Sequence, residues 1–148
     1  QHQAEVAASD LFFPNGSVIT PDGRTLIVAE TFAACLTAFD IEPSGRLSNR
    51  RIWAQLDGAV PDGICLDTAG GIWVASPTSQ ECLRVRAGGE VTDRIKVEDE
   101  AFACMLGGEN GRQLFILTAP SSVPKDCQQA RAGKIVCTEV EHARAGCP

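Results

Sequence analysis

The apolar residues of this chain fall into short runs, and each run is bounded by glycine, proline, asparagine or aspartate. Residues 26–29, 72–75 and 114–117 are continuously apolar. A helix needs about ten or more residues with apolar positions every three or four, and these runs are shorter than that. A continuously apolar run between turn residues is typical of a strand that is buried on both faces. The pattern therefore predicts an all-β protein.

The runs recur in a repeating order. The motif Pro-Asn-Gly at residues 14–16 recurs as Pro-Asp-Gly at residues 61–63, and each copy leads to a turn and then to an apolar strand. A third, looser copy begins at residues 102–106. Further strands are expected in register at residues 35–39, 49–53, 82–85, 91–95 and 134–137. Four short strands per unit of about 40–50 residues, joined by Asp-Gly and Asn-Gly turns, are typical of a β-propeller blade.

The repeat also predicts how the chain is divided. We expect an outer strand of a preceding blade in residues 1–13, a first full blade in 14–57, a second in 58–100 and a third, incomplete blade in 101–148. Three blades cannot close a ring, and ring closure is what removes exposed sheet edges. We therefore predict that residues 1–148 are the C-terminal half of a propeller, with about three four-stranded blades of a six-bladed ring. A second half-propeller, or a second copy in a homodimer, would complete the ring.

Composition and charge exclude several classes of function. The chain has 13 basic and 19 acidic residues and a formal net charge of -6, so no general electrostatic footprint on nucleic acid is expected. A mean hydropathy of -0.02 and the lack of a long uncharged apolar run argue against a membrane-spanning helix. Residues 1–6 have neither the basic nor the apolar region of a signal peptide, which favours a cytoplasmic protein.

The seven cysteines are an odd number, so at least one thiol stays unpaired. Cys-x-x-Cys spacing is absent and the two histidines lie near the ends of the chain, so a cysteine–histidine zinc site has little support. Cys127, Cys137 and Cys147 flank or follow residues 119–132, a predicted solvated loop, and a disulfide there is the alternative to free thiols. The other four lie in apolar runs and are expected to be buried: Cys35, Cys65, Cys82 and Cys104.

One column of the aligned repeat carries candidate chemistry. Asn15, Asp62 and Ala103 occupy the same position, at the start of the innermost strand of each unit. In a propeller these strands line the central channel, so their first residues converge at one mouth. The oxygens of Asn15 and Asp62 are hard ligands that suit calcium or magnesium and tolerate zinc or manganese. The glycines that follow, Gly16 and Gly63, are expected to leave room for an ion or substrate. The alternative is that Asn15 and Asp62 only form turns.

An ordered set of motifs also runs along the chain. It comprises Phe-Pro-Asn-Gly at 13–16, Thr-Pro-Asp-Gly-Arg-Thr-Leu-Ile-Val-Ala-Glu-Thr at 20–31, Leu-Thr-Ala-Phe-Asp at 36–40, Leu-Ser-Asn-Arg-Arg at 47–51, Pro-Asp-Gly-Ile-Cys-Leu-Asp at 61–67, Gly-Ile-Trp-Val-Ala at 71–75, Phe-Ala-Cys-Met-Leu-Gly-Gly at 102–108 and Gly-Lys-Ile at 133–135. In this order the motifs resemble the C-terminal half of the SMP-30/gluconolactonase/LRE-like (regucalcin-like) family. The resemblance implies a six-bladed propeller with one divalent metal on its axis, which hydrolyses sugar lactones and related esters.

The resemblance also implies roles for two residues. Asn15 matches the family's metal-binding asparagine, and Asp62 matches its metal-binding aspartate, which is also the expected general base. The expected cofactor is one divalent ion, calcium first, with zinc, magnesium or manganese as alternatives. The expected partner is a small-molecule lactone or ester substrate. The family's third metal ligand and its substrate-binding arginine and asparagine have no counterpart here, so the chain alone is expected to lack part of the site.

Two other functions fit the same residues, because a fold does not by itself determine a function. One is a non-enzymatic propeller that binds calcium or another protein. The other is a propeller enzyme that resembles strictosidine synthase or paraoxonase. Tight, stoichiometric metal binding would separate the enzymes from a plain interaction scaffold, and a panel of aldonolactones, aryl esters and amine–aldehyde pairs would separate the two enzymes.

Overall fold

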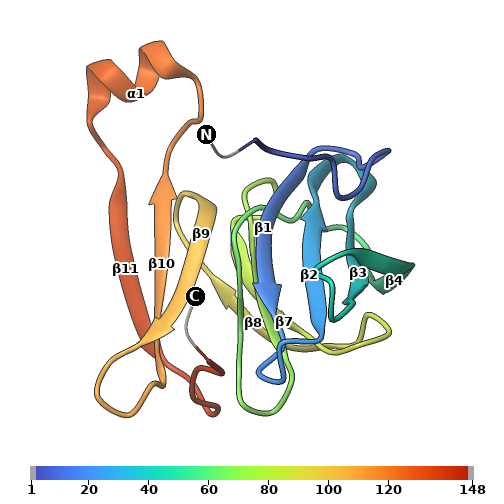
Figure 1. Cartoon of the computed structure of the whole chain (residues 1–148). Helices are drawn as coiled ribbons and strands as arrows, with labels where there is room; N and C mark the ends of the chain where they lie inside the picture. The colour runs from blue at the N-terminus through green and yellow to red at the C-terminus, as the bar shows by residue number, and fades with distance from the viewer. Residues whose placement is uncertain (1–2, 147–148) are drawn as a thin grey trace.

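A computed structural model describes residues 3–146, which fold into three antiparallel sheets (Figure 1). The first contains, in order, β1 (Pro14–Ile19), β2 (Thr25–Glu30), β3 (Cys35–Ile41) and β4 (Leu47–Gln55). The second contains β5 (Ile64–Leu66), β6 (Ile72–Ser76), β7 (Glu81–Val85) and β8 (Val91–Lys96). The third contains β9 (Glu100–Gly107), β10 (Gln113–Ala119) and β11 (Lys134–Glu139). Each predicted strand of the repeat is present.

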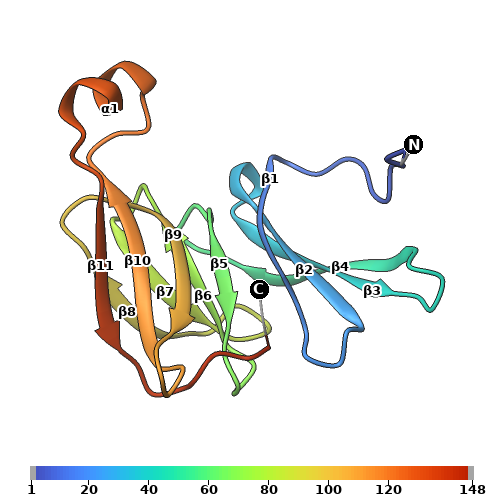
Figure 2. The same ribbon diagram turned by 60° about the vertical axis from the view of Figure 1, so that its left-hand side comes forward.

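The three sheets are arranged as blades around a common inner side. Strands that are neighbours in sequence are neighbours in each sheet, and the inner strand β5 contacts both β1 and β9. Figure 2 shows β5 standing between β1 and β9. We call the sheets the first, second and third blade in chain order. The predicted all-β propeller architecture is confirmed.

In each of the first two blades, the turn of the first hairpin contains a glycine at the equivalent position. Gly23 and Gly70 end the turns between β1 and β2 and between β5 and β6, with φ of 71° and 74°. Only glycine adopts that left-handed conformation without steric cost, so these turns depend on it. The turns set the register of the inner hairpins, which places the start of β1 and the start of β5 at the same end of the blades.

The core lies between the blades, in two apolar clusters. One joins the first blade to the second, with Ile27, Leu36 and Ile64 among its members. The other joins the second blade to the third, with Trp73 and Leu114 among its members. Since the second blade packs on both sides, all residues of β6 and β7 are buried. Burial on both faces explains why residues 72–75 of β6 are continuously apolar rather than alternating. In β7 the two charged residues, Glu81 and Arg84, are buried in ion pairs.

Residues 3–13 contain no strand, although an outer strand of a preceding blade was predicted there. A strand needs a neighbour to pair with, and the described residues offer no fourth sheet. The segment instead lies over one end of the first blade, where the Arg50 guanidinium donates to the carbonyls of Ser9 and Asp10. The backbone N–H of Phe12 donates to the Glu30 carboxylate at 2.7 Å.

The third blade has three strands, and the chain after β11 returns to the second blade. The N–H of Arg144 donates to the carbonyl of Gly111 at 2.9 Å, and the N–H of Ala145 donates to that of Leu66 at 2.9 Å. Among the residues that the structure describes, no strand follows β11 in the third blade. This return segment ties the third blade to the second.

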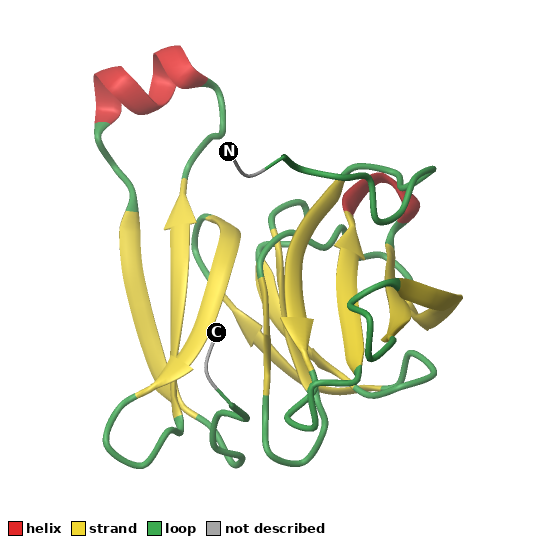
Figure 3. Ribbon diagram, in the orientation of Figure 1, coloured by secondary structure: helices red, strands yellow, loops and turns green. Residues whose placement is uncertain are grey.

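A short helix, α1 (Pro124–Ala130), stands in the segment that was predicted to be loop throughout (Figure 3). Pro124 occupies the first turn, where its missing N–H costs nothing, and Arg131 ends the helix in a left-handed conformation with φ of 47°. The loop prediction is wrong for these seven residues, but all of them are exposed, as expected of a solvated segment. The helix extends beyond the ends of β10 and β11 (Figure 1).

The cysteines follow the predicted division. The four in apolar runs are buried, and Cys127 and Cys137 are exposed free thiols. Cys147 lies outside the described residues, so a disulfide that involves it stays a prediction. Within residues 3–146, none of the helices has the length and apolar character needed to cross a membrane.

Candidate functional site

The three predicted column positions lie on neighbouring inner strands, with Asn15 in β1, Asp62 just before β5 and Ala103 within β9 rather than at its start. The N–H of Gly16 donates to the carbonyl of Asp62 at 3.0 Å, which joins the first blade to the second. The N–H of Gly63 donates to the carbonyl of Phe102 at 2.9 Å, which joins the second blade to the third. A similar hydrogen bond thus recurs between neighbouring blades, but its acceptor in the third blade is Phe102, one residue before the aligned Ala103.

The two glycines have a different role from the predicted one. A Cβ on Gly16 would lie 2.6 Å from the carbonyl oxygen of Asp62 and 2.7 Å from the nitrogen of Ile64. A Cβ on Gly63 would lie 2.7 Å from the Cα of Ala103. Neither position has room for a side chain, because the backbone of the next inner strand occupies it. Glycine is needed here for the close approach of the strands, not to leave space for an ion.

Asp62 is half-buried, and hydrogen bonds to the second strand of its blade fix the backbone at and before this residue. Its N–H donates to the carbonyl of Ala75 at 3.0 Å, and Ser76 Oγ accepts the N–H of Val60 at 3.1 Å, two residues earlier. Burial raises the pKa of the Asp62 carboxyl above its ordinary value, while the nearby Asn15 amide acts in the opposite direction. The two predicted ligands are therefore neighbours.

Thr31 belongs to the same site, although sequence reasoning missed it. It is the first residue of the 3-10 turn η1 (Thr31–Ala33), directly after β2. Its hydroxyl lies 2.8 Å from the carbonyl oxygen of Pro61 and 3.4 Å from Nδ2 of Asn15. The only signal in the sequence was a polar residue after an apolar strand, which is ordinary for the end of a strand.

The predicted column offers two side-chain oxygen ligands. Asn15 and Asp62 offer one amide oxygen and one carboxylate, which are suitable ligands for a hard divalent cation. Ala103, at the third position of the column, has no ligating atom. Among residues 3–146, groups of three or more histidine, cysteine, aspartate or glutamate side chains able to hold a metal are absent. A calcium ion takes about six to eight oxygen ligands, so others must come from backbone, water or further protein.

Three other acidic side chains are buried, and each is paired with an arginine. The pairs are Glu30 with Arg50, Asp67 with Arg84, and Glu81 with Arg94, at 3.2, 2.6 and 2.9 Å. Because a carboxylate in such a pair is already neutralised, these residues stabilise the blades and are poor candidates for a metal ligand.

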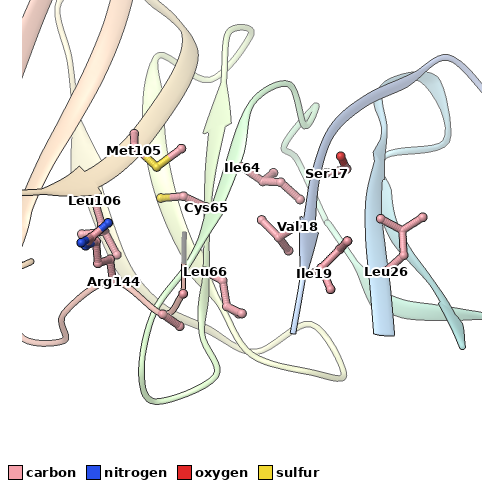
Figure 4. Close-up of a pocket in the computed structure, with 12 residues that line it drawn as sticks. Ser17, Val18, Ile19, Leu26, Ile64, Cys65, Leu66, Met105, Leu106 and Arg144 are labelled. Carbon is pink, nitrogen blue, oxygen red and sulfur yellow. The ribbon is translucent and has the colours of Figure 1, made fainter. Parts of the chain in front are cut away.

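A cavity of about 360 Å³ lies along the inner strands, further from their starts than the candidate site (Figure 4). Its walls are mainly apolar, with Val18, Ile64 and Leu66 among them, and Arg144 of the return segment also lines it. Neither Asn15 nor Asp62 lines this cavity. The apolar cavity and the polar candidate site are therefore separate places on the same three strands.

Sequence comparison relates the chain to lactonases and regucalcins. It matches the profile of the SMP-30/Gluconolactonase/LRE-like region over residues 1–120. It is 28% identical to a 6-deoxy-6-sulfogluconolactonase of Pseudomonas putida, over 80% of this chain and 42% of that protein. It is 33% identical to a regucalcin of Danio rerio, over 71% of this chain and 37% of that protein. The chain thus spans about half the length, or less, of the curated relatives that it matches.

Structural comparison agrees. The luciferin-regenerating enzyme superposes with a TM-score of 0.77 at 18% identity, over 92% of this chain and 48% of that one. A gluconolactonase from Xanthomonas campestris superposes with a TM-score of 0.66 at 31% identity, over 76% of this chain and 37% of that one. A regucalcin from Agrobacterium tumefaciens, described as a calcium-binding protein, gives 0.71 at 17% identity, over 90% and 47%.

Proposed function

The chain belongs to the SMP-30/gluconolactonase/LRE-like family, and from that membership we propose that the whole protein is a metal-dependent hydrolase of sugar lactones. The relatives include a 6-deoxy-6-sulfogluconolactonase and a gluconolactonase, which supports a lactone as the substrate. The observation that carries the proposal is the placement of Asn15 and Asp62 on neighbouring inner strands, which are joined by the hydrogen bond from the N–H of Gly16 to the carbonyl of Asp62 at 3.0 Å. The rest of the site comes from a second half-propeller.

Asn15 and Asp62 are the residues that would hold the cation. Both offer ligating oxygens, and among residues 3–146 the partly buried carboxylate of Asp62 has no basic partner that would neutralise it. This donor set fits calcium first, with magnesium, manganese and zinc as alternatives. When bound, such an ion supplies Lewis-acid polarisation of the lactone carbonyl, an effect worth several kcal/mol.

Asp62 also acts as the general base. One carboxylate oxygen accepts a proton from the attacking water, while the other remains available to the cation. The water oxygen bonds to the carbonyl carbon, the ring C–O bond breaks, and the proton held on Asp62 returns to the leaving ring oxygen. Burial raises the pKa of Asp62 and so strengthens it as a base, whereas a nearby cation lowers that pKa. Using separate oxygens for the two roles reconciles these opposing effects.

The second half-propeller would cover the two outward faces of this chain. The first blade exposes Ile19 and Ile52, and the third exposes Leu117 and Ile135. Apolar residues in blades are normally buried against the next blade, and ring closure removes such exposed faces.

Light scattering tests this assembly. A mass near twice 15.7 kDa supports paired halves, whereas a stable monomer shows that the other blades must come from a different polypeptide or segment.

Cation binding and turnover test the function itself. Calorimetric titration of the chain with calcium, manganese and zinc should show one site that is weakened in Asn15→Ala and Asp62→Asn. Asp57→Asn is the matched control, because Asp57 is exposed and has no hydrogen bond among the described residues. In the assembled ring, Asp62→Asn should abolish lactone hydrolysis while some cation binding remains. Retained hydrolysis would remove Asp62 from the role of base.

A non-enzymatic, calcium-binding propeller is the second candidate function. It is favoured by the similarity to regucalcins, one of which is described as a calcium-binding protein. A propeller enzyme like strictosidine synthase or paraoxonase is a third. Saturable calcium binding without turnover of aldonolactones, aryl esters or amine–aldehyde pairs by the assembled ring would favour the second.

A further inference from the structure

The hydroxyl of Thr31 contacts the side chain of one candidate ligand, Asn15, and the residue that precedes the other, Asp62. Its backbone N–H donates to the carbonyl of Phe13 at 3.1 Å, which holds it beside the start of β1. Its hydroxyl bonds across the blade boundary to Pro61, the residue before Asp62, at 2.8 Å. The same hydroxyl lies 3.4 Å from Nδ2 of Asn15. One side chain thus reaches the first ligand directly and the second through its neighbouring peptide.

The hydrogen-bonding capacity of a hydroxyl sets the orientation of the Asn15 amide. A threonine hydroxyl has a single hydrogen, and the Pro61 carbonyl can only accept, so that hydrogen is used there. The hydroxyl oxygen is then left as an acceptor. Of the two ends of the Asn15 amide, only Nδ2 can donate to it, because the opposite flip would place Oδ1 against another oxygen. Oδ1 is therefore the end that is turned away from Thr31 and remains free to bind a cation.

We propose that Thr31 is a positioning residue, which selects the flip of the Asn15 amide and links it to the peptide that carries Asp62. The identity of the bound cation rests on the proposed function, but the orientation of Asn15 does not. At 3.4 Å the contact between Thr31 and Asn15 is long, so its effect is on orientation more than on stability. Residues that orient a metal ligand typically change metal affinity by about 10-fold to 100-fold.

Two variants and one control test this role. Thr31→Val has nearly the same shape but neither donates nor accepts, and Thr31→Ser restores the hydroxyl. Thr20→Val is the matched control, because the Thr20 hydroxyl bonds Asp22 at 2.6 Å in the turn at the other end of β1. The first measurement is the pair of side-chain amide NMR signals of Asn15 in the metal-free chain, assigned by their loss in Asn15→Ala. The second is calcium affinity by calorimetry.

We expect two dispersed Asn15 signals in the unchanged chain, in Thr31→Ser and in Thr20→Val, and a shift to the positions of a freely exposed asparagine in Thr31→Val. Calcium affinity should fall by about 10-fold to 100-fold in Thr31→Val only. Unchanged Asn15 signals in Thr31→Val would overturn the proposal. Equal losses in Thr31→Val and Thr20→Val would also overturn it, because they would indicate general destabilisation. If the unchanged chain binds no calcium, manganese or zinc, the proposed function loses its metal, but the Asn15 signals still decide the role of Thr31.

Discussion

The guanidinium of Arg84 and the carboxylate of Asp67 form an ion pair wholly inside the second blade. Arg84 Nε lies 2.6 Å from Oδ2 of Asp67, Nη2 lies 3.2 Å from Oδ1, and the two side chains are 3% and 0% exposed. Asp67 also accepts the N–H groups of Ala69 and Gly71. The guanidinium fills the space that a side chain at Gly71 would need, so glycine is required there.

Arg84→Leu should lower the free energy of unfolding by about 3–5 kcal/mol, because it leaves the Asp67 charge buried without a partner. The matched control is Arg86→Leu, two residues along the chain, where an exposed pair with Glu90 at 3.7 Å is worth at most about 1 kcal/mol. Urea unfolding of both variants measures the difference. Equal losses would show that the buried pair is not a special contributor.

Glu30 should make the first blade sensitive to acid. Its burial alone would raise its pKa, but hydrogen bonds from Thr37, from the N–H of Phe12 and from Arg50 together hold that pKa below its ordinary value of 4.5. A lowered pKa in the folded state means that the charged form favours folding. Its contribution is therefore fully present above about pH 4.5 and is lost as the pH falls through the lower, folded value.

Glu30→Gln tests this dependence on pH. The variant should be less stable than the unchanged chain at neutral pH, and the difference should shrink as the pH falls to about 3. Urea unfolding across this range gives the curve. Glu90→Gln, at an exposed position, should show no comparable change with pH. A constant difference between Glu30→Gln and the unchanged chain would contradict the prediction.

Gly16→Ala should disrupt the junction of the first and second blades. The added Cβ would meet backbone atoms at 2.6 and 2.7 Å, and backbone cannot move aside as a flexible side chain can. Overpacking of this kind typically costs about 1–3 kcal/mol. Gly133→Ala is the control, since its Cβ would meet only the carbonyl of Thr118, at 3.6 Å. Thermal unfolding compares the two, and an unchanged midpoint for Gly16→Ala would show that the strands can separate at no cost.

The thiols should divide into two classes of reactivity. In a Cys147→Ser background, Cys127 and Cys137 should react at once with a thiol reagent, because both are exposed. The four buried cysteines should react only as the protein unfolds: Cys35, Cys65, Cys82 and Cys104. The adjacent Cys104 thiol, at 3.9 Å, and burial both raise the pKa of Cys65, which suppresses its reactive thiolate. The loss of both fast thiols, with a mass lower by two hydrogen atoms, would reveal a disulfide between Cys127 and Cys137.

The helix α1 shows where local signals were weak. Pro124 in the first turn and Asp126 near the helix start are both start signals, but a helix of seven residues is close to the shortest that forms at all. In residues 3–13, by contrast, a strand was expected and is absent. Their apolar pattern suits a strand, but a strand forms only where a neighbouring strand is available for pairing, and that is not a local property.

The strands, the turns and the position of Asn15 and Asp62 in the repeat can be predicted from the residues alone, because each blade is a meander of neighbouring hairpins whose turn residues act locally. The atoms that meet between blades cannot be predicted in this way. The contact of Gly16 with Asp62 and the bond from Thr31 to Pro61 join residues far apart in the chain. Such contacts depend on how one blade packs against the next. The hydrophobic pattern drives this packing and specifies which face of a blade is buried. It does not specify which polar atoms of the two blades lie within hydrogen-bonding distance of each other.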